Sequence, residues 1–135
     1  IDPDNTELYT QNRDAYIAEL DTADADVREV LADKEGSSFI VYHPAWGYFA
    51  DEYGLEQIAV EIEGKEPSVQ DMQNLIDTAN EEGIKVIFVQ SGFSTSSAQT
   101  IADEIGGEVV EVDPLAKDYI DNLANVTAAF EKGLA

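Results

Sequence analysis

Apolar positions along the chain follow two alternating periods. Short runs of β-branched and aromatic residues alternate with stretches in which apolar residues recur every three or four positions. The short runs predict strands at residues 39–42, 58–62, 86–89 and 109–112. The longer stretches predict helices at residues 46–53, 67–83, 94–106 and 117–132. Such alternation is typical of an α/β protein whose parallel sheet is covered by helices on both faces.

The region before the first strand predicts a helical segment over residues 2–33. Pro3 suits a helix start, and Tyr9, Tyr16 and Leu20 fall on one stripe of the helix. The polar run at residues 21–24 predicts a break into a long and a short helix. We therefore expect a helical region followed by a unit of four βα repeats, with no linker or low-complexity segment between them.

Composition narrows the function classes. The 135 residues, 44% of them hydrophobic, suit one domain with a real core. No apolar run approaches the roughly 18 residues that cross a bilayer. The net charge of −22 argues against nucleic acid and anionic membranes as partners. The absence of cysteine excludes disulfides, zinc–thiolate sites and thiol nucleophiles. The start at Ile1, without methionine or leader, leads us to expect a piece of a longer protein.

Metal-binding residue types stand at two predicted strand ends, each before a proline. His43 precedes Pro44, and Asp113 precedes Pro114. Ligands of open α/β sheets bind at the carboxyl ends of the strands, and proline both ends a strand and keeps the preceding residue extended. Each residue alone has a structural explanation, as a histidine packed under a loop and as a cap of the following helix. Together they form half of an imidazole and carboxylate metal site, whose other ligands must come from elsewhere.

Other polar clusters carry weaker signals. Glu61, Glu63 and Glu66 follow the second predicted strand, and we interpret them as a solvated acidic loop, with a catalytic carboxylate pair as the alternative. The serine-rich residues 91–97 precede a helix start, where an anion can bind, but they lack the lysine of a phosphate-binding loop. The aromatic side chains within residues 46–53 are expected to form core and cleft wall.

Several stretches resemble one family of transport proteins. They are HPAWGYFADEYGL at residues 43–55, EPS at 66–68, VIFVQSGFS at 86–94 and VEVDPLA at 110–116. With them, nearly the whole chain resembles the C-terminal lobe of the zinc- and manganese-binding solute-binding proteins of ABC transporters, the ZnuA and TroA types.

The resemblance implies two α/β lobes joined by one long helix, with a metal ion held between them by two ligands from each lobe. Residues 1–36 would then be the connecting helix region and residues 37–135 the C-terminal lobe, while the N-terminal lobe is absent. The ligand pair of this lobe falls on His43 and Asp113. A histidine at position 43 implies Zn²⁺, with Mn²⁺ as the alternative. Gln90 departs from the glutamate common at that position in relatives.

The implied function is capture of a divalent metal outside the cytoplasm and delivery to an ABC permease, by a protein that is membrane-anchored in its full-length form and is not an enzyme. This segment would not span the membrane. With only two ligands an ion would stay mostly hydrated, so the resemblance implies a weak or empty half-site in the isolated lobe. Two alternatives remain. One is a stand-alone regulatory α/β module resembling a receiver domain, although the acidic cluster after strand one and the lysine after the last strand are missing. The other is a hydrolase or transferase that uses Asp113 and His43 as acid and base.

Overall fold

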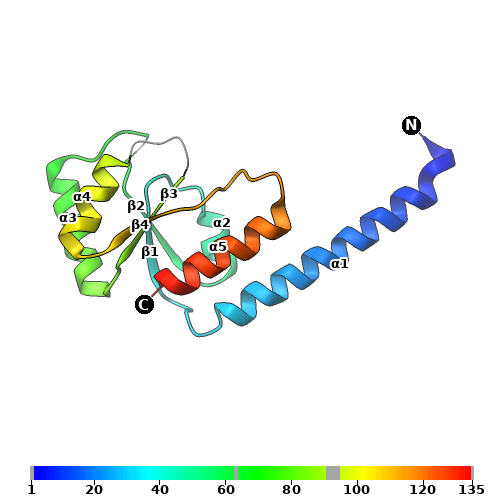
Figure 1. Cartoon of the computed structure of the whole chain (residues 1–135), viewed down its shortest axis with the longest axis horizontal. Helices are drawn as coiled ribbons and strands as arrows, with labels where there is room; N and C mark the ends of the chain where they lie inside the picture. Colours follow the sequence, from blue (N-terminus) through cyan, green and yellow to red (C-terminus); the bar gives the residue numbers. More distant parts are fainter. Residues whose placement is uncertain (1, 63, 91–94, 135) are drawn as a thin grey trace.

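A four-stranded parallel sheet lies at the centre of the structure (Figure 1). The computed structural model describes residues 2–62, 64–90 and 95–134. The strands are β1 (Ser38–Val41), β2 (Glu56–Ala59), β3 (Val86–Val89) and β4 (Glu108–Glu111), in the order β2-β1-β3-β4. The predicted α/β fold with a parallel sheet is therefore confirmed. The order places β1 and β3 side by side in the middle.

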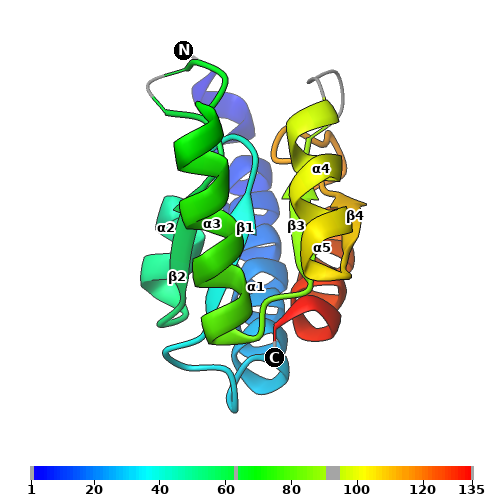
Figure 2. The same cartoon turned by 90° about the vertical axis from the view of Figure 1, so that its left-hand side faces the viewer.

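Helices cover both faces of the sheet. They are α1 (Thr6–Val30), α2 (Gly47–Glu52), α3 (Val69–Glu82), α4 (Ser96–Ile105) and α5 (Tyr119–Gly133), with a 3₁₀ turn η1 (Pro3–Asn5) before α1. Helices α3 and α4 lie on one face, and α2, α5 and the end of α1 lie on the other (Figure 2). None of the helices in the described part of the chain is both long and apolar enough to cross a bilayer.

Two apolar cores result from the alternation of side chains along the buried central strands. Phe39 and Phe88 point toward α5, where they contact the fully buried ring of Phe130. Ile40 and Ile87 point to the opposite face and pack under α3 and α4. All four residues of β3 are buried, as the near-continuous apolar run led us to expect.

The long helix α1 runs without interruption, so the predicted break at residues 21–24 is wrong. Thr22 donates its hydroxyl hydrogen to the carbonyl oxygen of Ala18 at 2.9 Å, and Arg28 pairs with Asp24 one turn away at 2.9 Å. Both contacts satisfy these polar side chains without replacing a backbone hydrogen bond of the helix. The helix therefore continues through the polar run. The N-terminal part of α1 extends away from the sheet, and the predicted stripe with Tyr9 and Tyr16 is exposed there (Figure 1).

Most element boundaries shift by one to three residues from the predicted ones, while β3 lies at Val86–Val89 as predicted. Strand β2 begins at Glu56, because this residue pairs with Ser38 at the start of β1. Helix α3 begins at Val69, two residues after the predicted start, because Ser68 caps it and forms a reciprocal capping box with Asp71. The predicted start of the next helix, at residue 94, lies outside the described residues.

Candidate metal centre

The carboxyl edge of the sheet contains a topological switch point. The chain leaves β1 toward β2 on one side, then crosses to β3 on the other side and continues to β4. Loops diverge at such a point, and the crevice between them is where open α/β sheets bind ligands. His43 and Asp113 follow β1 and β4 by two residues each, so both lie at this edge. Strand β3 separates their strands, which places β1 and β4 about 10 Å apart.

The imidazole of His43 is paired with the carboxylate of Glu61. Its Nδ1 atom lies 2.5 Å from Oε1 of Glu61, whose side chain is only 9% exposed, against 40% for His43. The parallel register explains the contact. Val41 is the partner of Ala59, and the pairing continues past the strands as Val60 donates to Val41. Two further positions along this register, residues 43 and 61 stand opposite each other.

The loop after His43 is held at several points. The amide of Ala45 donates to the carbonyl oxygen of His43 at 2.8 Å, and the amide of Trp46 donates to Oε1 of Gln57 at 2.8 Å. The indole of Trp46 then packs edge-on against Phe130 in the core. These contacts tie the backbone that carries the imidazole to both β2 and α5.

Asp113 belongs to a turn rather than to a helix start. Its Oδ1 atom accepts a hydrogen bond from the amide of Leu115 at 2.8 Å, and its carbonyl oxygen accepts one from Nδ2 of Asn122 at 2.8 Å. Helix α5 begins only at Tyr119, with Asp118 before it. The alternative interpretation of Asp113 as a helix cap is therefore wrong. The contacts orient an exposed carboxylate at the rim of the sheet.

The acidic loop after β2 is more ordered than a solvated loop. Glu66 accepts hydrogen bonds from the hydroxyls of Ser97, at 2.5 Å, and Tyr42, at 2.8 Å. The Ser97 contact and then the Tyr42 contact lower the pKa of Glu66, while burial first and Glu66 second raise the pKa of Tyr42 to about 12. For Glu61 the solvated interpretation is wrong, and Glu63 lies outside the described residues. Sequence reasoning missed the pairing of Glu61 with His43, because nothing local indicates the partner.

No group of three or more histidine or acidic side chains in the described ranges is arranged to hold a metal ion. The two predicted ligands therefore share an edge of the sheet without forming a closed site by themselves. A cavity of about 360 Å³ adjoins both of their loops, with Trp46 and Pro114 in its wall.

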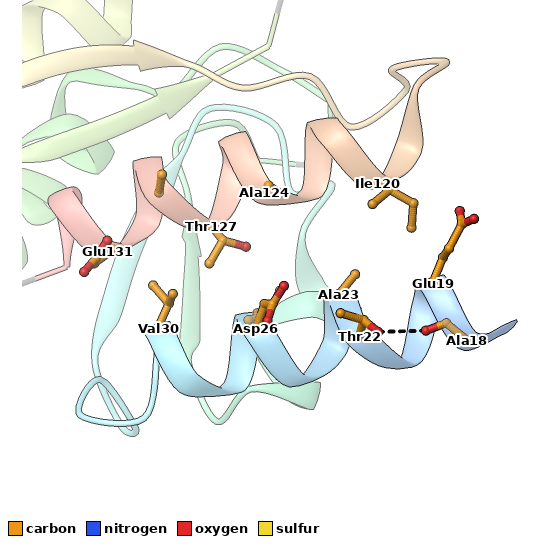
Figure 3. A pocket seen from close by; sticks show the side chains of 12 residues that line it. Ala18, Glu19, Thr22, Ala23, Asp26, Val30, Ile120, Ala124, Thr127 and Glu131 are labelled. Carbon is orange, nitrogen blue, oxygen red and sulfur yellow. Dashed lines mark hydrogen bonds between the residues drawn. The ribbon is translucent and has the colours of Figure 1, made fainter. Parts of the chain in front are cut away.

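The larger hollow lies elsewhere, between α1 and α5 (Figure 3). Its volume is about 540 Å³, and its walls are mainly apolar, with Ala23, Val30 and Ile120 among them. Neither predicted ligand lines this groove, and its acidic side chains, Glu19, Asp26 and Glu131, form no group arranged to hold a metal ion in the described residues. We therefore place the candidate metal site at the strand ends.

Comparison with known families and structures identifies the family of this chain. The family described as "Zinc-uptake complex component A periplasmic" matches residues 1–133. The chain is 38% identical over 109 residues, 79% of its length, to the high-affinity zinc uptake system protein ZnuA of Bacillus subtilis, of which it covers 34%.

Among solved structures, a crystal structure of ZnuA superposes with a TM-score of 0.94 at 42% sequence identity, over 98% of this chain and 52% of that one. The metal-dependent lipoprotein YcdH of Bacillus subtilis superposes with a TM-score of 0.81 at 34% identity, over 98% of this chain and 55% of that one. The chain thus spans about a third of the curated relative named above and about half of each of these two solved chains. It belongs to the ZnuA family of zinc-uptake components.

Proposed function

We propose that this chain is one lobe of an extracytoplasmic solute-binding protein that captures Zn²⁺ and hands it to the permease of an ABC importer. Residues 1–36 would form the connecting helix region, residues 37–135 the C-terminal lobe, and a second lobe would complete the protein. The observation that carries the proposal is the placement of His43 and Asp113 at one edge of the sheet, beside the switch point.

The donor atoms suit the proposed cargo. An imidazole nitrogen and a carboxylate oxygen are common zinc ligands, and zinc sites in proteins usually have four ligands in a tetrahedron. This lobe would supply two of them, and the second lobe the others. The relatives named for zinc uptake support zinc over manganese, which remains the alternative cargo.

The mechanism is capture rather than catalysis. His43 would bind through Nε2, because Nδ1 faces Glu61, and Asp113 would bind through its carboxylate. Ligands from both lobes would close the cleft around the ion, and the closed form would dock on the permease. The family description as periplasmic, together with the similarity to a lipoprotein, supports a membrane-anchored protein outside the cytoplasm. We propose neither a catalytic nor a receiver-like role.

A zinc titration of this chain tests the half-site. His43 is the single histidine, so the ¹⁵N signals of the imidazole report one residue without assignment. We expect a saturable shift of Nε2 on addition of zinc and a weaker response in Asp113→Ala. Zinc that leaves the His43 signals unchanged, both here and with the second lobe present, would refute the assignment.

Ligand removal in the two-lobed protein gives the second test. His43→Ala and Asp113→Ala should each weaken zinc binding by more than the 10- to 100-fold that is typical of losing an outer partner of a ligand. A competition titration with Mn²⁺ on the same proteins decides the cargo. Equal affinity of the wild type and both variants would contradict the proposed site.

A further inference from the structure

We propose that Glu61 is a positioning residue for the metal ligand His43: it holds the proton on Nδ1 and thereby directs the lone pair of Nε2 to the metal. The inference rests on the proposed function, which it deepens by adding a residue that binds no metal itself. Glu61 stands 18 positions after His43, two residues past the end of β2, and no local sequence signature indicates its contact with His43.

The short contact fixes which ring nitrogen carries the proton. The Nδ1 atom and Oε1 of Glu61 are 2.5 Å apart, so a hydrogen lies between them. An ionised carboxylate has only acceptor atoms, so the donor must be Nδ1–H. A neutral ring with its proton on Nδ1 has its lone pair on Nε2, which is the atom that can bind a cation.

The surroundings give the carboxylate a fixed position. The amide of Glu61 donates to the carbonyl oxygen of Tyr42 at 3.1 Å, which holds the chain just past β2 against the chain just past β1. The side chain is 9% exposed, so the carboxylate contacts protein far more than water. A buried acceptor at a fixed position restricts rotation of the ring and so orients Nε2 toward the metal.

The neighbouring carboxylate provides a contrast. Glu66 comes from the same loop, yet its oxygens accept from Tyr42 and Ser97 instead of from His43. The two acidic residues therefore have different tasks, since Glu66 joins the end of β1 to α4, whereas Glu61 serves the imidazole. This difference makes Glu66 a matched control.

The first experiment measures the tautomer without any metal. Long-range ¹H–¹⁵N spectra of this chain are recorded on the neutral ring, at the alkaline end of a pH series. We expect the wild type to show the Nδ1–H tautomer, and Glu61→Ala to revert to the Nε2–H tautomer that a neutral histidine prefers in water. Glu61→Gln, which keeps an acceptor oxygen at the same reach, should retain Nδ1–H, and Glu66→Ala should leave the tautomer unchanged.

The second experiment measures zinc affinity of the same variants in the two-lobed protein. Glu61→Ala should weaken binding about 10- to 100-fold, the usual effect of removing the partner of a ligating histidine. Glu61→Gln should recover most of this loss. Trp46 fluorescence shows whether each variant is folded.

The outcomes separate the two proposals. A wild-type ring in the Nε2–H form, or an Ala variant that alters neither the tautomer nor the affinity, would overturn the role of Glu61 and leave the zinc site standing. A changed tautomer with unchanged affinity would also overturn it. If the His43 signals of the wild-type two-lobed protein do not change on addition of zinc, the proposed function is overturned, and the role of Glu61 with it.

Discussion

The indole ring of Trp46 meets the ring of Phe130 edge to face, with centroids 5.9 Å apart and planes inclined by 65°. Trp46 is the single tryptophan and lies three residues after His43, while Phe130 is fully buried in α5. The contact therefore joins the loop of the candidate ligand to the core. It also makes the fluorescence of Trp46 a probe of both folding and the metal site.

Removal of the Phe130 ring should cause a large loss of stability. The ring stacks on Phe88 at 4.4 Å and meets Phe39 edge-on at 4.6 Å, so its loss opens a cavity among aromatic side chains. We expect Phe130→Ala to lower the free energy of unfolding by about 3–5 kcal/mol. Urea unfolding followed by Trp46 fluorescence measures it. Phe130→Leu should lose less stability, because leucine fills more of the cavity than alanine. Equal losses of stability in both variants would contradict the cavity argument.

A side chain at Gly107 should force β4 away from β3. A Cβ atom there would lie 2.1 Å from the carbonyl oxygen of Lys85, which accepts the hydrogen bond from Glu108 that starts the pairing of these strands. Overpacking of this kind lowers the free energy of unfolding by about 1–3 kcal/mol. The clash is with backbone atoms, which cannot move aside as a flexible side chain can. Chemical denaturation of Gly107→Ala measures the loss.

The adjacent Gly106 supplies the control, because it has open space but a φ of +63°. Gly106→Ala should cost about 1 kcal/mol from its left-handed backbone alone. A Gly107→Ala variant as stable as the wild type would disprove the close approach.

Alkaline pH should destabilise the fold through two tyrosines. Burial, followed by the contact with Glu66, raises the pKa of Tyr42 to about 12, and burial, followed by the contact with Asp24, raises that of Tyr53 to about 12. Both values exceed the ordinary 10.0, so the stabilisation is complete below pH 10 and is lost as pH rises through about 12. Unfolding measured across this window should show a decline that Tyr42→Phe and Tyr53→Phe each reduce.

Tyr48→Phe is the matched control, since that ring is 95% exposed. If all three phenylalanine variants follow the wild-type curve, then neither buried hydroxyl contributes to the alkaline decline.

Asn122 should support metal binding through Asp113. Its Nδ2 atom donates to the carbonyl oxygen of Asp113 and so links the turn of the candidate ligand to α5. We expect Asn122→Ala to weaken zinc binding in the two-lobed protein about 10-fold, at the low end for an outer partner, because it contacts the backbone and not the carboxylate. Isothermal titration calorimetry measures the change. Asn125→Ala, at an exposed position of the same helix, should retain wild-type affinity. A loss as large as that of Asp113→Ala would indicate that Asn122 does more than position the turn.

The fold class followed from local information. Apolar runs in β1 and β3 predicted buried strands because each strand is covered on both faces. The two candidate ligands could also be selected locally. Pro44 and Pro114 stop their strands from continuing, because proline lacks an amide hydrogen and has a fixed φ. The carboxyl ends of the strands in a parallel sheet lie at one edge.

The continuity of α1, the strand order and the partner of His43 depended on the tertiary structure. The polar run that predicted a break in α1 is satisfied by contacts one turn away and by Tyr53, the residue after α2, whose hydroxyl donates to Asp24. The contact between His43 and Glu61 arises because β1 and β2 pair in parallel with a register of 18 residues. No local period encodes that offset, since the crossover through α2 sets it. The sequence alone therefore identified the ligand candidates, and only the folded sheet could supply the carboxylate that orients one of them.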